Sequence, residues 1–331
     1  MFVVDNFPGS TKDVMPAPIK VVAPALMRAK VEPHLPEGVS VSWFDTSQEA
    51  IDLAPQADVG WFDLFSLKDR ADAIVAATNV KWLSTIVAGL DALPLDVLRQ
   101  RNVVVTNGSG LNSETVADYA VMGVLTMAKG FPDVVRAFDR REWPTDAPGR
   151  FELDGSRALV IGYGTIGRMI GKRLEAFGVR VTGVRRNAAP GEDVLDGASW
   201  RGQLDDFDWV IIAAPATNQT KALIGADELA AMKDSARIVN IARGDLIDQA
   251  ALIAALEEKR IGGAFLDVTT PEPLPSDHPL WSAPNCMITM HLSGRSQTSM
   301  FPRGAERFVA NLRRYVAGEP LEHQVDLAAG Y

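Results

Sequence analysis

Three residues in the second half of the chain, Arg243, Glu272 and His291, have side chains suited to binding an anion and moving a proton. A histidine titrates near neutrality and can donate a proton, while a carboxylate beside it favours the imidazolium and orients the ring. A planar guanidinium can hold a carboxylate and polarise a carbonyl. Taken singly, each residue also suits a structural role or a solvated loop. Because all three follow runs of strand type, and such loops form the ligand crevice of doubly wound sheets, we expect them to meet.

A glycine-rich turn precedes these residues in the chain. Residues 157–178 are typical of a strand, the spacing Gly162-x-Gly164-x-x-Gly167 and a helix. Gly162 permits a tight turn, Gly164 lets the backbone approach a pyrophosphate, and Gly167 allows close packing of helix on strand. The alternative is a turn that binds no ligand. The residues expected to bind a dinucleotide here are Gly162, Tyr163, Gly164, Thr165, Ile166 and Gly167.

The end of the following strand indicates which dinucleotide is bound. An acidic residue at this place would accept hydrogen bonds from the adenosine ribose and select NAD. This chain has Arg185, Arg186 and Asn187 instead. No acid is there to repel a 2′-phosphate, and two guanidinium groups can grip it, so we predict NADPH as the cofactor. The alternative is that both arginines are solvated charges at a strand end.

The composition excludes several classes of protein. The chain has 331 residues, of which 47% are apolar, which favours two globular domains at about 150 residues each. Its net charge of -9 restricts any nucleic-acid surface to a local patch. Cys286 is the only cysteine, so neither an intrachain disulfide nor a zinc cluster is expected, and no metal. With no apolar run of about 20 residues and no secretory type of start, we expect a cytoplasmic protein with no membrane or nucleic-acid partner.

Strand-type runs alternate with helical stretches in both halves of the chain, which indicates parallel sheets. In the first half the runs are 19–24, 39–44, 57–62, 80–85 and 102–107. In the second half they are 157–162, 179–184, 208–215, 236–241, 262–268 and 286–290. Long helices are expected at 113–129 and roughly 297–316, with an exposed connection at 139–154. The expected fold class is α/β, with two doubly wound, Rossmann-like parallel sheets.

These motifs are joined by a longer distinctive stretch, which runs from Ala213 through the loop of Glu272 to the segment HLSG at 291–294. In combination they resemble the D-isomer-specific 2-hydroxyacid dehydrogenase family, over most of residues 80–331. The resemblance implies transfer of a hydride from NADPH to the carbonyl of a small 2-oxo acid, giving the D-2-hydroxy acid. It assigns the proton to His291, the carboxylate partner to Glu272 and anion binding to Arg243. The arginine pair and the ending LEHQVDLAAGY are most like the NADPH-dependent glyoxylate/hydroxypyruvate reductase branch.

Further cofactor contacts follow from the resemblance alone. Asp267 and the carbonyl of Ile241 match positions that meet the nicotinamide carboxamide. Ala214 and Pro215 match the loop beside the adenosine and its ribose, and Ser293 is expected among the cofactor residues.

In the first half, the segment STIVAGLDAL resembles the glycine loop of the family, whose N–H groups at Val87, Ala88 and Gly89 would bind the substrate carboxylate. The alternative is a plain turn before a helix that Asp91 caps. Trp61 ends a strand and could wall the pocket for the substrate side chain, with core packing as the alternative.

The resemblance also implies the organisation of the chain. Residues 1–107 with 295–331 are expected to form a flavodoxin-like substrate domain, and 108–294 an NADP-binding Rossmann domain. The family forms homodimers, so we expect the helix at 113–129 in an interface and Trp143 reaching toward a partner. One departure concerns the catalytic segment, where Met290 stands in place of the proline that many relatives have before the histidine.

Two other functions fit the same motifs. A nucleotide-sensing corepressor or scaffold on this fold can retain all three charged residues. A dehydrogenase of the formate or phosphite type would keep the enzyme and change the substrate. Oxidation of NADPH with glyoxylate, hydroxypyruvate or bulkier 2-oxo acids separates the first from a reductase, and product formation from formate tests the second.

Overall fold

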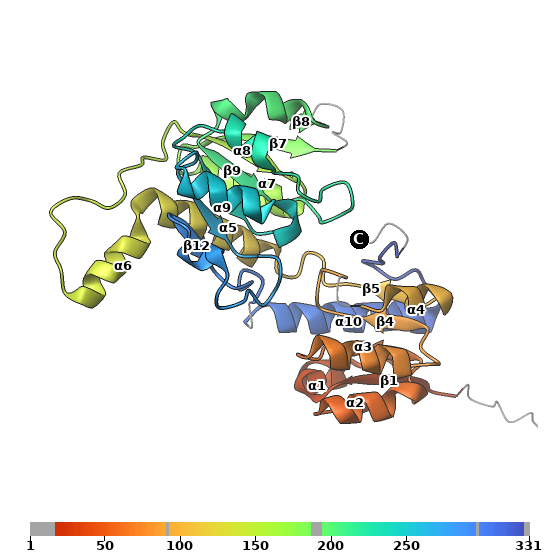
Figure 1. Cartoon of the computed structure of the whole chain (residues 1–331). Helices are drawn as coiled ribbons and strands as arrows, with labels where there is room; N and C mark the ends of the chain where they lie inside the picture. Colours follow the sequence, from red (N-terminus) through yellow and green to blue (C-terminus); the bar gives the residue numbers. More distant parts are fainter. Residues whose placement is uncertain (1–16, 91–92, 187–193, 296–297, 328–331) are drawn as a thin grey trace, which may run out of the picture. The chain divides into compact units, whose positions relative to one another are not determined.

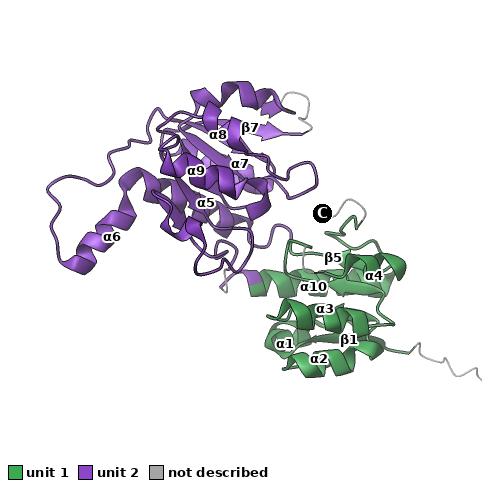
Figure 2. Ribbon diagram, in the orientation of Figure 1, with its two compact units in different colours: residues 1–108, 301–331 green, residues 109–300 purple. Residues whose placement is uncertain are grey.

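The computed structural model describes residues 17–90, 93–186, 194–295 and 298–327 (Figure 1). The chain forms two compact units (Figure 2). Unit 1 comprises residues 1–108 and 301–331, and unit 2 comprises residues 109–300. The substrate and cofactor roles expected for the two parts stay predictions.

Unit 1 is built on a five-stranded parallel sheet with the order β2-β1-β3-β4-β5. Its strands are β1 (Ile19–Pro24), β2 (Val39–Phe44), β3 (Val59–Trp61), β4 (Trp82–Ser84) and β5 (Val104–Thr106). Its α-helices are α1 (Arg28–Val31), α2 (Ser47–Leu53), α3 (Leu67–Ala76), α4 (Leu95–Gln100) and α10 (Met300–Ala317), with 3-10 turns at η1 (Ala25–Met27), η2 (Glu32–His34) and η3 (Ala54–Gln56).

Both faces of this sheet are covered. In β1, Val21 and Ala23 share a core cluster with Phe308 of α10, whereas Val22 shares one with Ala50 of α2. Successive side chains of a strand point to opposite faces, so a continuously apolar strand needs helices on both sides.

Unit 2 carries a seven-stranded parallel sheet with the order β12-β11-β10-β9-β6-β7-β8. Its strands are β6 (Arg157–Ile161), β7 (Arg180–Arg185), β8 (Val194–Asp196), β9 (Trp209–Ile212), β10 (Arg237–Asn240), β11 (Gly263–Leu266) and β12 (Cys286–Ile288). Its helices are α5 (Ser113–Lys129), α6 (Phe131–Arg140), α7 (Thr165–Glu175), α8 (Ala226–Ala231) and α9 (Gln249–Glu257), with 3-10 turns at η4 (Ser199–Asp206), η5 (Gly244–Leu246) and η6 (Pro279–Ser282).

The first strand of unit 2, β6, lies between β7 and β9, so the chain order reverses beside it. Trp209 and Ile211 of β9 pack on the side of α5 and α7, and Val210 and Ile212 on the side of α8 and α9. A reversal of this kind leaves a crevice at the carboxyl ends of the strands, where α/β sheets bind ligands.

The predicted fold class is confirmed, because both sheets are parallel and flanked by helices. The helix expected at 113–129 is α5 with the same bounds. The final helix begins at Met300 rather than near 297. Strand β8 was not anticipated from its short, partly polar segment. No helix of the described residues is long and apolar enough to cross a bilayer.

Candidate active site

The structure brings Glu272 and His291 together at the carboxyl ends of neighbouring strands. Glu272 follows β11 and His291 follows β12, which pair in parallel. The distance from His291 Nδ1 to Glu272 Oε2 is 2.7 Å, and Glu272 Oε1 accepts a hydrogen bond from the Thr269 N–H at 3.0 Å. Both side chains are partly exposed, so the pair can reach a ligand.

The surroundings keep the Glu272 carboxyl ionised. Burial by itself would raise its pKa, but hydrogen bonds from His291 and the Thr269 N–H, with the charges of His291 and Arg243, hold the pKa below the ordinary value. An ionised carboxylate only accepts hydrogen bonds, so His291 Nδ1 must carry the proton of this contact. The other ring nitrogen, Nε2, is thereby left for exchanging a proton with a ligand.

Arg243 follows the next strand of the sheet. It lies three residues beyond the end of β10, and β10 pairs with β11. Its Nη1 donates to the carbonyl of Ala242 at 2.7 Å. Asn240, which sequence reasoning missed, holds this turn: its side chain donates to the Arg243 carbonyl at 2.8 Å and accepts from the Ala242 N–H at 3.0 Å. A polar residue at the end of a buried strand was the available signal.

A left-handed turn carries His291. Both Met290 and His291 have positive φ, at 53° and 57°. A proline, whose φ is fixed near −65°, could not adopt the conformation that Met290 has here.

The buried carboxylate of Asp267 fastens this turn. Its Oδ1 accepts from the Thr289 hydroxyl at 2.8 Å and the Leu292 N–H at 2.9 Å, and both its oxygens accept from the N–H of buried Ser293. Its backbone carbonyl accepts from the His291 N–H. The contact of Asp267 with a nicotinamide carboxamide stays a prediction, as does that of Ile241, which is buried just beyond β10.

The glycine turn lies between β6 and α7 and has the geometry its spacing indicates. Gly162 has a φ of 97°, and a Cβ there would lie 2.4 Å from the N of Ala214. A Cβ on Gly167 would lie 2.3 Å from the Gly162 carbonyl oxygen, whereas one on Gly164 would meet nothing within 4 Å. Gly162 and Gly167 are therefore required by the fold, and Gly164 faces open space.

The side chain of Tyr163 packs inward from this turn. A Cβ on Gly183 of β7 would lie 2.4 Å from its ring, and one on Gly171 of α7 would lie 2.7 Å from its hydroxyl. Burial raises the pKa of the Tyr163 hydroxyl. The Tyr163 ring therefore packs against β7 and α7, and a contact of Tyr163 with the dinucleotide stays a prediction. Thr165 and Ile166 open α7, where N–H groups lack helical acceptors.

The end of β7 lies directly beside the glycine turn. The N–H groups of Gly162 and Tyr163 both donate to the carbonyl of Val184, at 3.0 and 2.8 Å. Arg185 is the next residue, and Arg186 after it is exposed. Asn187 lies outside the described residues, as does Asp91 in unit 1. Pro215, next to Ala214, is exposed.

In unit 1 the predicted carboxylate loop is at the surface, with Val87 and Ala88 exposed and Gly89 half-buried. Trp61 is only 1% exposed, and its ring centroid lies 4.7 Å from that of Phe308. The structure therefore favours the core-packing alternative for Trp61 over a pocket wall.

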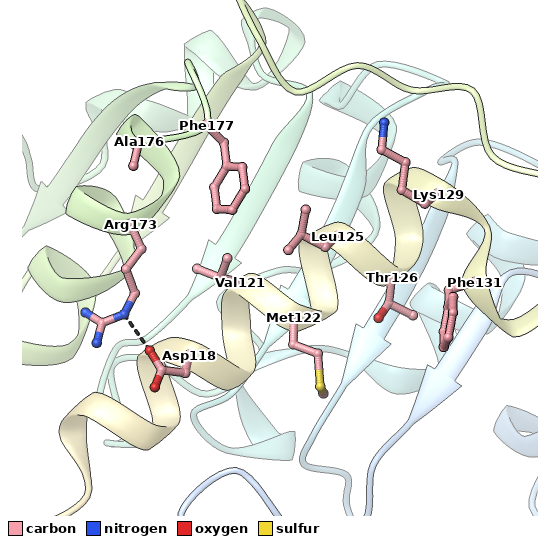
Figure 3. Close-up of a pocket in the computed structure, with 10 residues that line it drawn as sticks. All are labelled: Asp118, Val121, Met122, Leu125, Thr126, Lys129, Phe131, Arg173, Ala176 and Phe177. Carbon is pink, nitrogen blue, oxygen red and sulfur yellow. Dashed lines mark hydrogen bonds and ion pairs between the residues drawn. The ribbon is translucent and has the colours of Figure 1, made fainter.

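A groove of about 620 Å³ lies elsewhere in unit 2, between α5 and α7. Figure 3 shows its apolar side chains, with Arg173 of α7 bound to Asp118 of α5 at 2.6 Å. It is lined by Asp118, Val121, Met122, Leu125, Thr126, Lys129, Phe131, Arg173, Ala176 and Phe177. None of the candidate catalytic residues is among them.

The glycine turn allows a prediction that separates folding from ligand binding. Gly167→Ala should lower the free energy of unfolding by about 1–3 kcal/mol, because its Cβ overlaps the Gly162 carbonyl. Gly164→Ala should change it by less than about 1 kcal/mol yet weaken dinucleotide binding about tenfold or more. Gly202→Ala, where a Cβ also meets nothing within 4 Å, is the control. Equal affinities for Gly164→Ala and Gly202→Ala, measured by fluorescence titration, would contradict the assignment of the turn.

Comparison with known proteins agrees with this arrangement. Residues 121–293 match the family model described as D-isomer specific 2-hydroxyacid dehydrogenase, NAD binding domain. The chain is 32% identical over 274 residues to the glyoxylate reductase/hydroxypyruvate reductase of Homo sapiens, covering 79% of this chain and 82% of that protein. It is 29% identical over 297 residues to the glycerate dehydrogenase of Methylorubrum extorquens, covering 87% and 91%.

A solved structure of a D-isomer specific 2-hydroxyacid dehydrogenase family protein from Aeromonas salmonicida has the same fold. It superposes with a TM-score of 0.83 at 27% identity, over 94% of this chain and 99% of that chain. On its motifs, its fold and these relationships, the chain belongs to the D-isomer specific 2-hydroxyacid dehydrogenase family.

Proposed function

We propose that this dehydrogenase reduces a small 2-oxo acid of the glyoxylate or hydroxypyruvate type to the D-2-hydroxy acid, using NADPH. The observation that carries the proposal is the 2.7 Å contact of His291 Nδ1 with the ionised Glu272, which leaves Nε2 to serve a ligand. The glyoxylate/hydroxypyruvate reductases among the relatives support the substrate class.

The chain's own residues divide the work of the reaction. When bound, the reduced nicotinamide supplies a hydride to the carbonyl carbon of the substrate. His291 delivers a proton from Nε2 to the carbonyl oxygen, and Glu272 stabilises the imidazolium before transfer. Arg243 binds the substrate carboxylate and polarises the carbonyl with its planar fork.

The cofactor is assigned to unit 2 and the substrate loop to unit 1. The turn at Gly162–Gly167 receives the pyrophosphate, and Arg185 with Arg186 receives the 2′-phosphate. Ala214, Pro215 and Ser293 remain proposed cofactor neighbours. We propose a cytoplasmic location for the enzyme, with which its single cysteine is compatible.

A substrate screen tests this function. The purified protein should oxidise NADPH with glyoxylate or hydroxypyruvate faster than with bulkier 2-oxo acids, and chiral chromatography of the hydroxypyruvate product should find the D-isomer. Absence of oxidation with every 2-oxo acid would overturn the reductase and favour a nucleotide-sensing protein. Product formation from formate with NADP would favour the formate-type enzyme instead.

We also propose that the protein is a homodimer joined through unit 2. The groove between α5 and α7 is apolar, and α6 projects from the sheet with exposed Phe131 and Phe138 (Figures 1 and 3). Trp143, just after α6, is 95% exposed. Apolar surface of this extent is typical of an interface.

Light scattering should therefore find a particle of twice 35.7 kDa. Phe138→Glu should shift the mass toward that of the monomer, because a charge would have to be buried in the interface. Phe65→Glu is the matched control, since Phe65 is a fully exposed phenylalanine of unit 1. A monomeric wild-type protein would contradict the proposal.

A further inference from the structure

The carboxylate of Asp63 holds the loop that follows β4. Asp63 lies two residues beyond β3, and β3 pairs in parallel with β4, so both strands end at the same edge of the unit 1 sheet. Asp63 Oδ2 accepts from the Ile86 N–H at 2.7 Å, and Oδ1 accepts from the Thr85 hydroxyl at 2.5 Å. The indole N–H of Trp61 also donates to Oδ2, at 2.6 Å, and helps to hold the carboxylate in place.

The Asp63 contact also fixes the direction of the next hydrogen bond. Because the hydroxyl proton of Thr85 goes to the carboxylate, the Thr85 oxygen is free to accept, and it accepts from the Val87 N–H at 3.1 Å. Asp63 therefore controls the N–H of Ile86 directly and the N–H of Val87 through Thr85.

The carbonyls of the same loop accept hydrogen bonds from the segment that follows β5. The Val87 carbonyl accepts from the Gly108 N–H at 3.0 Å, and the Ala88 carbonyl accepts from the Asn107 side chain at 2.8 Å. A Cβ on Gly108 would lie 1.8 Å from the Ile86 carbonyl oxygen, so the two segments pack in close contact.

Two donors of this loop are left over. The N–H groups of Ala88 and Gly89 have no acceptor among the residues that the structure describes. Ala88 is exposed and Gly89 half-buried, so an approaching anion can reach both. Of the three donors expected from the sequence, the Val87 N–H is thus already engaged inside the loop.

We propose that Asp63 is a positioning residue for substrate binding: it locks residues 85–87 so that the N–H groups of Ala88 and Gly89 receive the carboxylate of the 2-oxo acid. This inference rests on the proposed function and refines it. An ionised carboxylate suits the task because it accepts from three donors at once. An asparagine has a single side-chain oxygen, so its NH2 group would face either the Thr85 hydroxyl or the N–H groups of Ile86 and Trp61. The negative charge of Asp63 is engaged by those donors rather than directed at the substrate.

The test compares two aspartates at opposite ends of β3. Asp63→Asn should raise KM for glyoxylate about 10- to 100-fold, the range expected for hydrogen bonds to a charged group, with KM for NADPH and kcat changed less than about threefold. Thr85→Val, which removes the relay to Val87, should raise KM less, about 3- to 10-fold. Asp58→Asn is the control. Asp58 lies just before β3, and its carboxylate likewise accepts from a backbone N–H, that of Lys20, at 2.9 Å.

A second readout does not depend on catalysis. In the unliganded protein, hydrogen exchange of a peptide covering residues 84–90 should accelerate in Asp63→Asn and stay unchanged in Asp58→Asn. Unchanged exchange in Asp63→Asn, or a KM no higher than that of Asp58→Asn, overturns the inference.

A wild-type protein that reduces no 2-oxo acid would refute the proposed function without deciding this role. The exchange experiment and a titration with oxamate, an unreactive 2-oxo acid analogue, then decide it. Faster exchange with weaker oxamate binding in Asp63→Asn supports the role of Asp63, and no difference from Asp58→Asn removes it.

Discussion

His291→Ala is expected to lower kcat for 2-oxo acid reduction by about 10²–10⁴-fold, the usual contribution of a general acid. NADPH affinity should change less than about threefold, because the Nδ1 of His291 is bound to Glu272 and its Nε2 is directed to the substrate's oxygen in the proposed reaction. Steady-state kinetics and fluorescence titration of NADPH measure the two quantities separately.

His278→Ala is the matched control for that experiment. His278 is a histidine of the same unit whose Nδ1 accepts from the Leu280 N–H at 3.2 Å, and it has no proposed role in catalysis. Normal kcat in His291→Ala would remove the proton donor from the mechanism. A loss of kcat as large in His278→Ala would show that the effect comes from the fold.

The pH dependence of the same reaction has a definite sign. In the proposed reaction the Glu272 carboxylate orients His291, so kcat/KM should fall as the pH drops through the pKa of Glu272 and the carboxylate takes up a proton. Against the opposing effect of burial, hydrogen bonds from His291 and the Thr269 N–H hold this pKa below its ordinary value, so the fall should begin at a lower pH than for an ordinary glutamate. Glu272→Gln cannot take up a proton, so it should lower kcat/KM and remove this acid limb from the measured pH profile.

The elements that the sequence predicts best are those in which local pattern and burial agree. Helix α5 has its expected bounds because a polar first turn, a long apolar stretch and Gly130 in the left-handed conformation mark both ends. Gly162 and Gly167 could be predicted equally well, because a Cβ at either position would lie less than 3 Å from a backbone atom.

Strand ends are less predictable because apolar residues continue past them. The run 57–62 contains β3, which covers only Val59–Trp61, although Phe62 beyond it is buried. Periodicity reports burial and not pairing, so a buried loop residue extends the apparent strand. Trp61 illustrates the same limit: its pattern is compatible with a pocket or a core, and only its packing on Phe308 distinguishes them.

Hydrogen bonds between residues far apart in the chain could not be predicted from the sequence. Asp63 binds Thr85 and Ile86, and Asp267 binds Leu292 and Ser293, across more than twenty residues of chain in each case. In both cases a carboxylate after one strand holds the backbone after the neighbouring strand. The strand order must be known before such a pair can be recognised.

The largest change in cofactor preference is expected from the arginines after the glycine turn. Replacing both, as Arg185→Asp with Arg186→Ala, should lower the NADPH/NADH ratio of kcat/KM by about 10²–10⁴-fold, because each charge-assisted hydrogen bond contributes about 1.5–3 kcal/mol. The location of Arg185 favours this result, since its neighbour Val184 accepts from the N–H groups of both Gly162 and Tyr163. The introduced aspartate would also repel a 2′-phosphate and accept from ribose hydroxyls instead.

A control at the other end of the same strand separates this local effect from the overall charge of the protein. Arg180→Asp repeats the Arg185→Asp change, which is two of the three charge units altered in the double variant, at the exposed start of β7. It should leave the cofactor preference within about twofold, because a charge a full strand length away is screened by salt. If the Arg185 and Arg186 variant kept the preference of the wild type, both arginines would be solvated strand-end charges. The specificity for NADPH would then have to be withdrawn, while the proton donor and the anion-binding residues would stand unaffected.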